Sequence, residues 1–508
     1  MFNLMTDQKE APGADGRGGA NAHLKSRVRK GAFWFMSGTA ARAMLRLIVM
    51  AVLARLLMPA DFGLVGAASI FVAFAELFSI SGIGLSIVQL REIQSRHVQT
   101  AYTTSALTGI VVGGTIWLIS GPIAALLDMP RMEPILEVLA LLFPLNSLAA
   151  VSQKLLEREL AYGKLAAIEV ASYFFGYSLF ALSFALAGFG VWALVYAQLA
   201  SAFVRITLLL RVQPHALRLS FDRRSYLELM RTGLGFSLAR YANFVAQKGD
   251  YFVVGRWLGA APLGLYERAY VLMDLSNSLL TNALNTILFP AFSKLQANRR
   301  ALAAAFERVS AILALVFLPV GIASSLLAPE IIRVLLGGNW GEAVAPFQVL
   351  ALAMFFRTAM KISSVVLTGA GSAYRVAWSQ TIYGFFVVAG ALVMVRYGIT
   401  AVAFATLAAL IVTYLVSTRQ ALRLVNMSWR RLAAAYLPAL AVAPIVAGTI
   451  LIVALPMRMV EAPPLLILIA AGGATLTLLS AILFTFPRLY GPHARWLLDQ
   501  LPINLFRR

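Results

Sequence analysis

A polar stripe crosses a stretch of the chain that is otherwise apolar enough to span a bilayer. Arg240, Asn243, Gln247 and Asp250 are spaced by three, four and three residues, so they share one face of a helix. Lys248 lies beside them. Because charged groups on a spanning helix are tolerated only where they face protein or water, this stripe predicts an enclosed, hydrated cavity.

Further cations lie on other predicted spans. Arg42 and Arg46 are four residues apart, as are Arg357 and Lys361, so each pair shares a helix face. Cations buried in hydrocarbon need acids or an anionic guest, and guanidinium groups suit pyrophosphate because they bind phosphate oxygens two at a time. The alternative is internal ion pairs that hold helices together. The predicted pyrophosphate-binding residues are Arg42, Arg46, Arg240, Lys248, Arg357 and Lys361.

Acids are fewer than cations within the predicted spans, so the cavity should be net positive. The mid-span acids are Glu76, Asp250, Glu267 and Asp274. Asp250 is the strongest candidate for ion coupling, because its protonation would respond to a neighbouring cation. A permanent pair with Lys248 or Arg240 is the alternative. Arg268, beside Glu267 and near Asp274, is expected to form a structural ion pair. The predicted ion-coupling residues are Asp250, Glu76 and Asp274.

The next predicted span carries a second polar stripe. Glu267, Tyr270, Asp274, Asn277 and Thr281 are spaced by three, four, three and four residues. Their side chains would share a helix face and suit hydrogen bonding to sugar hydroxyls. The alternative is a hydrated crevice without a ligand. The predicted glycan-binding residues are Asn243, Gln247, Tyr270, Asn277 and Thr281.

The composition is that of an all-α integral membrane protein. Of the 508 residues, 60% are hydrophobic and 13% are charged. Residues 1–30 are polar and end in a basic run, so we expect a disordered tail and no cleavable signal. The chain has no cysteine, which excludes disulfides, thiolate catalysis and cysteine-ligated metals. We predict no cofactor and no metal site.

The basic residues indicate the topology of the chain. About fourteen spans are predicted, and the loops on one side hold 29 lysines and arginines whereas those on the other hold 4. This asymmetry predicts that both termini are cytoplasmic. It also explains the net charge of +21 without a nucleic-acid partner. The predicted spans are 32–57, 62–89, 101–127, 134–153, 165–187, 189–210, 230–258, 263–292, 308–328, 343–368, 375–396, 399–420, 432–455 and 464–486.

The loops divide the chain into two predicted six-helix lobes and two extra helices. The longest outside loop, 328–341, is too short for a catalytic domain. The predicted regions are a disordered tail (1–30), an N-lobe (31–210), a basic cytoplasmic linker (211–229), a C-lobe (230–420), two further helices (421–487) and an amphipathic cytoplasmic tail (488–508).

An internal repeat relates the two lobes. An offset of 201 residues aligns the segment 54–64 with 255–265, so that Arg55 meets Arg256 and Gly63 meets Gly264. The same offset places Arg42 on Asn243, which duplicates the polar stripe. Transporters are often built from such repeats, with the binding site between them.

Three motifs resemble a known family. They are TrpPheMetSerGly (34–38), LeuAlaArgLeuLeuMetProAlaAspPheGlyLeuVal (53–65) and GlyIleGlyLeuSerIleValGln (82–89). They are similar to the Wzx-like polysaccharide-transporter, or oligosaccharide flippase, branch of the multidrug/oligosaccharidyl-lipid/polysaccharide (MOP) exporter superfamily. The resemblance implies a two-lobed flippase of the bacterial inner membrane. The implied substrate is an undecaprenyl-pyrophosphate-linked oligosaccharide for exopolysaccharide or O-antigen assembly, with polysaccharide polymerase and export machinery as further partners.

The predicted function is therefore non-enzymatic flipping by alternating access. One alternative is an ion-coupled drug or cation antiporter of the same superfamily, which would be expected to have an acid-lined cavity. Another is a membrane glycan polymerase or ligase, whose chemistry usually needs a sizeable outside loop with acids or metal ligands. The sequence does not distinguish among glycans, coupling ions or oligomeric states.

Overall fold

The computed structural model is helical, and no strand occurs among the residues it describes. These residues are 38, 41–79, 86–88, 90, 92–215, 218–233, 237–283, 288–485 and 491. Eleven helices within them are long and apolar enough to cross a membrane. The helix at 41–56, α12 (Ser237–Leu258) and α13 (Ala260–Ala283) are outside that set, so the total of fourteen spans stays a prediction. The two predicted tails lie outside the described residues, apart from residue 491.

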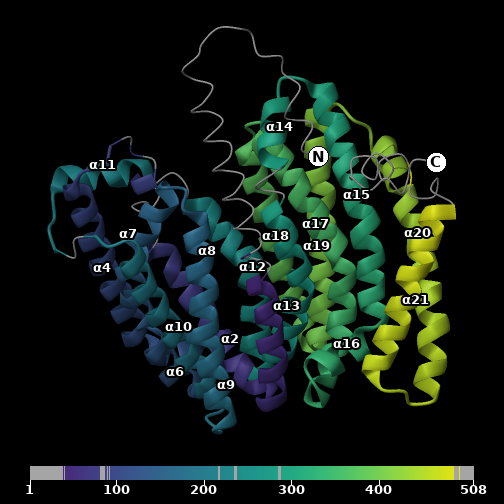
Figure 1. Cartoon of the computed structure of the whole chain (residues 1–508), viewed down its shortest axis with the longest axis horizontal. Coiled ribbons are helices and arrows are strands. Elements are labelled where there is room, and N and C mark those ends of the chain that lie inside the picture. Colours follow the sequence, from purple (N-terminus) through teal and green to yellow (C-terminus); the bar gives the residue numbers. More distant parts are fainter. Residues whose placement is uncertain are drawn as a thin grey trace.

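The first group of helices, the N-lobe, lies on one side of the molecule (Figure 1). The predicted span 101–127 is wrong as a single helix, because it divides between Ser95–Leu118 and Ser120–Leu127. Pro122 lies in the first turn of the second helix, where the missing N–H is tolerated. The predicted span 134–153 lies within one candidate membrane span, Pro130–Arg158. The N-lobe contains the helix at 41–56, α2 (Pro59–Ser79), α4 (Ser95–Leu118), α5 (Ser120–Leu127), η2 (Pro130–Met132), α6 (Glu133–Leu139), α7 (Leu142–Arg158), α8 (Tyr162–Ala171), η3 (Ser172–Ser178), α9 (Leu179–Leu186) and α10 (Val191–Val212).

The second group, the C-lobe, begins with α12 and α13 and lies beside the first (Figure 1). The predicted span 308–328 begins too late, because α15 already begins at Arg299. Asn298 caps it by accepting a hydrogen bond from the Ala301 amide at 3.1 Å, and the polar first turns carry no apolar signal that would have marked them. The predicted span 263–292 covers most of α13, which the structure describes as far as Ala283. The C-lobe continues with α14 (Phe289–Leu295), α15 (Arg299–Leu326), α16 (Ala328–Leu335), η6 (Gly338–Ala343), α17 (Val344–Gly369), α18 (Ala373–Met394), η7 (Val395–Tyr397) and α19 (Ile399–Val425).

Two further helices, α20 (Trp429–Met459) and α21 (Pro464–Thr485), follow the C-lobe. They stand at the outer edge of the molecule in Figure 1, where α20 packs on α15 and α21 packs on α20 and α16. Both present many apolar side chains outward, as expected of helices that face lipid. They contribute no lining residue to the cavity described below.

The linker between the lobes carries a short helix, α11 (Arg223–Gly233), which packs on α4. Asp222 caps α11 by accepting hydrogen bonds from the Ser225 hydroxyl at 2.6 Å and the Ser225 amide at 2.9 Å. These two bonds hold the pKa of the Asp222 carboxyl below its usual value. The cap therefore stabilises the fold at neutral pH, and this contribution is lost as the pH falls through the lowered pKa.

The lobes cross where α2 meets α13, and a glycine of each helix lies against the backbone of the other. A Cβ at Gly63 would collide with the carbonyl oxygen of Ala260, and a Cβ at Gly264 would collide with that of Pro59. Pro59 and Ala260 are 201 residues apart, as are Gly63 and Gly264. The offset found in the sequence thus places equivalent residues face to face, which is the arrangement of two repeats about a local two-fold axis. Only glycine allows the two backbones to approach so closely.

We expect Gly63→Ala to weaken this crossing. The added methyl group would push the two backbones apart, and overpacking of this kind costs about 1–3 kcal/mol. Thermal unfolding of the purified protein in detergent measures the loss. Gly114→Ala on α4 is the matched control, because a Cβ there meets nothing within 4 Å. Equal stability of the two variants would contradict the close approach of α2 and α13.

The two lobes make a second contact at the end of the molecule that carries α16. Trp340, which is fully buried, donates from Nε1 to the Ala54 carbonyl oxygen at 2.7 Å and meets the Phe62 ring edge-on at 5.4 Å. Arg55 donates to the Val334 carbonyl oxygen at 2.7 Å. The turn between the first helix and α2 is therefore held against α16 and η6 of the opposite lobe. We call this contact, formed by residues 54–62 and 334–340, the α16-end closure.

Candidate functional site

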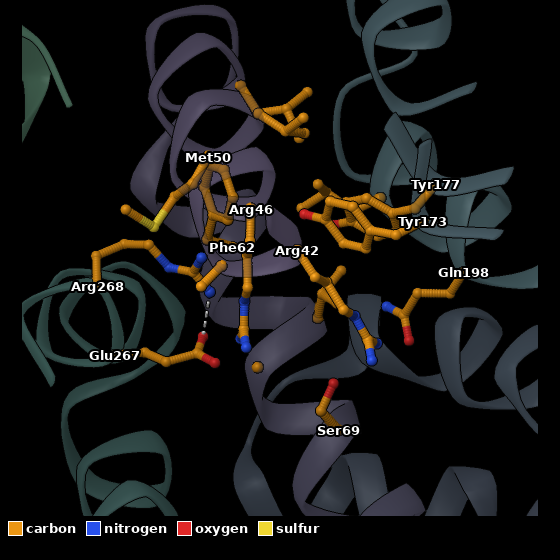
Figure 2. A pocket seen from close by; sticks show the side chains of 16 residues that line it. Arg42, Arg46, Met50, Phe62, Ser69, Tyr173, Tyr177, Gln198, Glu267 and Arg268 are labelled. Carbon is orange, nitrogen blue, oxygen red and sulfur yellow. Dashed lines mark ion pairs between the residues drawn. The ribbon is translucent and has the colours of Figure 1, made fainter. Parts of the chain in front are cut away.

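A cavity of about 550 Å³ lies where the lobes meet. The helix at 41–56, α2, η3 and α10 of the N-lobe form most of its wall, and α13 of the C-lobe completes it (Figure 2). Its volume is in the usual range for small-molecule sites. The charged side chains that line it are three arginines and one glutamate, so the wall is net positive. Its polar lining residues are Arg42, Arg46, Ser69, Tyr173, Tyr177, Gln198, Glu267 and Arg268.

Arg42 and Arg46 form the cationic face of the cavity. Their side chains lie one turn apart on the first helix and extend into the same space (Figure 2). Arg42 is paired with Glu169 at 2.7 Å, yet 48% of its side chain is exposed. Arg46 is also exposed and makes no ion pair with any residue that the structure describes. Two adjacent guanidinium groups, one of them unpaired, can bind an anion that carries two charges.

The C-lobe side of the cavity carries an ion pair. Arg268 Nη2 lies 3.1 Å from Glu267 Oε2, which agrees with the structural pair predicted for Arg268. The Arg268 guanidinium also lies over the Phe62 ring, 4.7 Å from its centroid. Because Phe62 lines the cavity and packs on Trp340, it connects the cavity wall to the α16-end closure.

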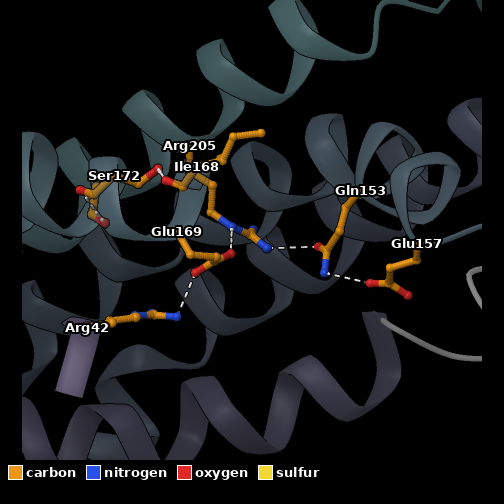
Figure 3. A network of polar contacts seen from close by, with 8 residues as sticks. Arg42, Gln153, Glu157, Ile168, Glu169, Ser172 and Arg205 are labelled. Atoms are coloured by element: carbon orange, nitrogen blue, oxygen red, sulfur yellow. Dashed lines mark hydrogen bonds and ion pairs between the residues drawn. The ribbon is translucent and has the colours of Figure 1, made fainter. Parts of the chain in front are cut away.

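Behind Arg42, a polar network extends through the N-lobe (Figure 3). Glu169 on α8 accepts from Arg42 through Oε2 and from Arg205 Nε through Oε1 at 2.8 Å. Arg205 also donates to Gln153 at 2.8 Å, and Gln153 donates to Glu157 at 2.9 Å. The Arg205 guanidinium is thus held by two partners inside the lobe.

Two tyrosines stand beside the arginines. Tyr173 and Tyr177 stack with ring centroids 5.0 Å apart and an interplanar angle of 16°. They lie on η3, a π-helical segment, and such segments occur often at functional sites. The Arg42 guanidinium is 6.0 Å from the centroid of the Tyr173 ring. With Gln198 and Ser69 they add hydrogen-bonding groups and an aromatic surface to the cationic face.

Asp250 lies in a separate, fully buried cluster of the C-lobe. Its carboxylate accepts hydrogen bonds from the Tyr266 hydroxyl at 2.8 Å and from the Tyr251 amide at 3.0 Å. The Thr406 hydroxyl is 3.4 Å away. Among the residues described, no cation lies within ion-pair distance of Asp250, and Lys248 instead covers the Tyr251 ring at 4.5 Å. The structure therefore shows no Asp250–Lys248 pair.

Arg357 occupies a neighbouring part of this cluster, in the interior of the C-lobe. It is only 8% exposed, pairs with Asp274 at 3.0 Å and donates to the Tyr270 hydroxyl. Lys361 lies one turn further along α17. The structure thus brings together Arg357, Tyr270 and Asp274, but none of them lines the cavity that holds Arg42 and Arg46.

The other predicted site residues lie elsewhere. Asn243 is half-buried and Gln247 exposed on α12, and Glu76 is half-buried on α2. The side chains of Arg240, Asn277 and Thr281 lie outside the described residues, although their helices are described.

Comparison with known proteins identifies the family. Residues 52–345, more than half of the chain, match the family described as polysaccharide biosynthesis protein. The chain belongs to this family.

The named relatives of this family member are also proteins of polysaccharide biosynthesis. The succinoglycan biosynthesis transport protein ExoT of Rhizobium meliloti is 27% identical over 66% of this chain and 67% of its own length. The lipopolysaccharide biosynthesis protein WzxC of Escherichia coli is 27% identical over 66% of this chain and 68% of its own. The teichuronic acid biosynthesis protein TuaB of Bacillus subtilis is 23% identical over 69% of this chain and 73% of its own length.

Solved structures confirm the fold of the family member. The lipid II flippase MurJ in an inward closed conformation superposes with a TM-score of 0.70 at 12% identity, over 89% of this chain and 99% of that one. An inward-facing MATE transporter of the MOP superfamily superposes with a TM-score of 0.58 at 17% identity, over 76% of this chain and 96% of that one. The chain is therefore a multi-pass membrane protein with the MOP transporter fold, as its sequence motifs predicted.

The sequence analysis did not single out Tyr173 and Tyr177, which line the cavity of this family member, or Glu169, which pairs with Arg42 behind it. They are spaced by four residues within the predicted span 165–187. The helix-face argument used for α12 would have grouped them, because residues four apart lie on one face. A single acid and two tyrosines are a weak signal beside the clustered arginines of other spans.

Proposed function

We propose that the protein is a flippase that moves an undecaprenyl-pyrophosphate-linked oligosaccharide from the cytoplasmic to the periplasmic leaflet of the bacterial inner membrane. The observation that carries this proposal is the net-positive cavity between the two lobes of a polysaccharide biosynthesis family member. The names of ExoT and WzxC support a role in exopolysaccharide or lipopolysaccharide assembly. The shared fold with MurJ, a lipid II flippase, supports flipping of a lipid-linked precursor. We assign the protein no catalytic reaction.

In this proposal the pyrophosphate binds at Arg42 and Arg46, and the first sugar lies against Tyr173 and Tyr177. Aromatic faces and hydroxyl or amide groups next to guanidinium groups suit a sugar that is attached to a phosphate. The predicted residues of the C-lobe remain part of the proposal. Arg357 would have to exchange its partner Asp274 for the substrate. The further predicted residues are Arg240, Lys248 and Lys361 for pyrophosphate, and Asn243, Gln247, Tyr270, Asn277 and Thr281 for the glycan.

Alternating access of the two lobes would move the bound headgroup while the polyprenyl chain stays in lipid. With both termini in the cytoplasm, an inside-negative potential favours outward movement of an anion by about 2.3 kcal/mol per charge per 100 mV. Asp250 remains the proposed ion-coupling residue, with Glu76 and Asp274 as further candidates. A polysaccharide polymerase and export machinery would receive the flipped unit. A drug or cation antiporter is the weaker candidate, because the cavity is net positive.

Deletion of the gene tests the proposed function. We expect the lipid-linked repeat unit to accumulate on the cytoplasmic leaflet and surface polysaccharide to be lost, because synthesis continues while translocation stops. Extraction of the lipid-linked pool, with a membrane-impermeant lectin or enzyme to report its leaflet, measures both effects. Re-expression of the intact chain is the control. An unchanged lipid pool and normal polysaccharide after deletion would contradict the proposal.

A further inference from the structure

Glu169 lies between two arginines that differ in how firmly they are held. Arg205 keeps a second partner, Gln153, at 2.8 Å, and 23% of its side chain is exposed. Arg42 has only Glu169 as a carboxylate partner within the described residues, lines the cavity and has 48% of its side chain exposed. Glu169 therefore has a neighbour with a second partner on one side and an arginine that lines the cavity on the other.

We propose that Glu169 is a counter-ion that the pyrophosphate of the substrate displaces from Arg42. This inference rests on the proposed function. In the unliganded cavity Glu169 lowers the net positive charge that surrounds Arg42 and Arg46. When a pyrophosphate binds both guanidinium groups, Glu169 gives up Arg42 and keeps its bond to Arg205 Nε. No carboxylate is then left buried without a partner, so the exchange leaves no uncompensated charge.

The exchange of Arg42 between Glu169 and pyrophosphate would affect both the return of the empty carrier and the release of the substrate. In a return step with an empty cavity, two unpaired cations would lie in the interior of the membrane protein, which is costly. Glu169 supplies a negative charge for that step. It also competes with the pyrophosphate for Arg42, which favours release of the substrate. A tightly held substrate would leave slowly, so a competing carboxylate raises the turnover of the carrier.

A purely structural role predicts the opposite effect on affinity. If Glu169 served only to hold Arg42 in place for the substrate, its loss would weaken binding. If it competes with the substrate, Glu169→Gln strengthens binding and slows export. The sign of the change in affinity therefore separates the two roles, whereas a loss of export alone does not.

The test is a titration of the full-length protein in detergent with farnesyl pyrophosphate, combined with an export assay in cells. We expect Glu169→Gln to lower the dissociation constant about two- to fivefold, as for removal of a partly exposed ion pair, and to reduce export. Glu157→Gln is the matched control, because Glu157 is a carboxylate of the same network that does not touch Arg42. It should leave the affinity unchanged.

The outcomes separate this inference from the proposed function. If the unmodified protein binds farnesyl pyrophosphate and Arg42→Ala weakens that binding, the proposed site stands. Unchanged or weaker binding by Glu169→Gln then overturns the counter-ion role alone. If the unmodified protein does not bind the probe, the pyrophosphate site and the counter-ion role both fail. Should Glu169→Gln not fold, Glu169→Asp shortens the reach to Arg42 while keeping a charge beside Arg205, and the same rise in affinity is expected.

Discussion

Replacing Arg46 with alanine is expected to reduce export about 10- to 100-fold. Arg46 lines the cavity and makes no ion pair within the described part of the chain, so its guanidinium is available to an anionic guest. A hydrogen-bonded contact to a charged group contributes about 1.5–3 kcal/mol, which corresponds to this range of affinity. Surface polysaccharide per cell, at matched levels of membrane-inserted protein, measures the effect.

The substitution should leave the fold intact. Arg46 is exposed on a helix, and alanine is a strong helix former, so the melting temperature should change little. Arg46→Lys keeps the charge but loses the planar fork, and it should retain part of the export activity. Arg211→Ala, at an exposed position at the end of α10, is the matched control for loss of one arginine. Normal export by Arg46→Ala would remove Arg46 from the proposed site.

The first cationic pair was predictable because it depends on spacing along one helix, and the repeat because it depends on a constant offset along the chain. The offset of 201 residues relates Gly63 to Gly264, and these residues meet in the structure. Arg42 and Arg46 share a helix face and line one cavity, as their spacing of four indicated. Apolar runs were sufficient for the class of fold, because they reflect transfer into the bilayer rather than contacts between helices.

The partners of the charged residues were not predictable in the same way. Arg205 and Glu169 are 36 residues apart and meet because α8 and α10 pack together. Arg357 pairs with Asp274 from a different helix, 83 positions earlier in the sequence. Helical spacing gives the face on which a residue lies but not the helix that it faces. The stripe on α12 accordingly divides, with Asp250 buried among C-lobe tyrosines and Gln247 exposed.

The α16-end closure is the contact that a transport cycle by alternating access must break. It holds the turn around Met58 of the N-lobe against Asn339 of the C-lobe, where Asn339 Nδ2 lies 3.8 Å from Met58 Sδ. Trp340 packs beneath on Phe62, and Phe62 lines the cavity. A guest that displaces Arg268 from the Phe62 ring would therefore disturb the packing of Trp340 as well. Phe62 is thus shared by the cavity wall and the α16-end closure.

Cross-linking Met58→Cys to Asn339→Cys is expected to arrest export completely in the linked molecules. The two side chains are exposed and adjacent, and the chain has no other cysteine, so a covalent bridge between the lobes would form at this pair alone. The bridge would fix the α16-end closure and prevent the substrate from leaving on that side. Export should fall in proportion to the linked fraction, measured by gel mobility after protease cleavage between the lobes, and a reductant should restore it.

The single variants Met58→Cys and Asn339→Cys are the controls, since they carry the same substitutions without a bridge. They should export normally with or without oxidant. Because alternating access requires the lobes to separate at this end once per cycle, a linked protein cannot complete a turnover. Full export by a fully linked population would mean that residues 54–62 and 334–340 stay together throughout transport, and the substrate would then have to leave by a route that does not open the α16-end closure.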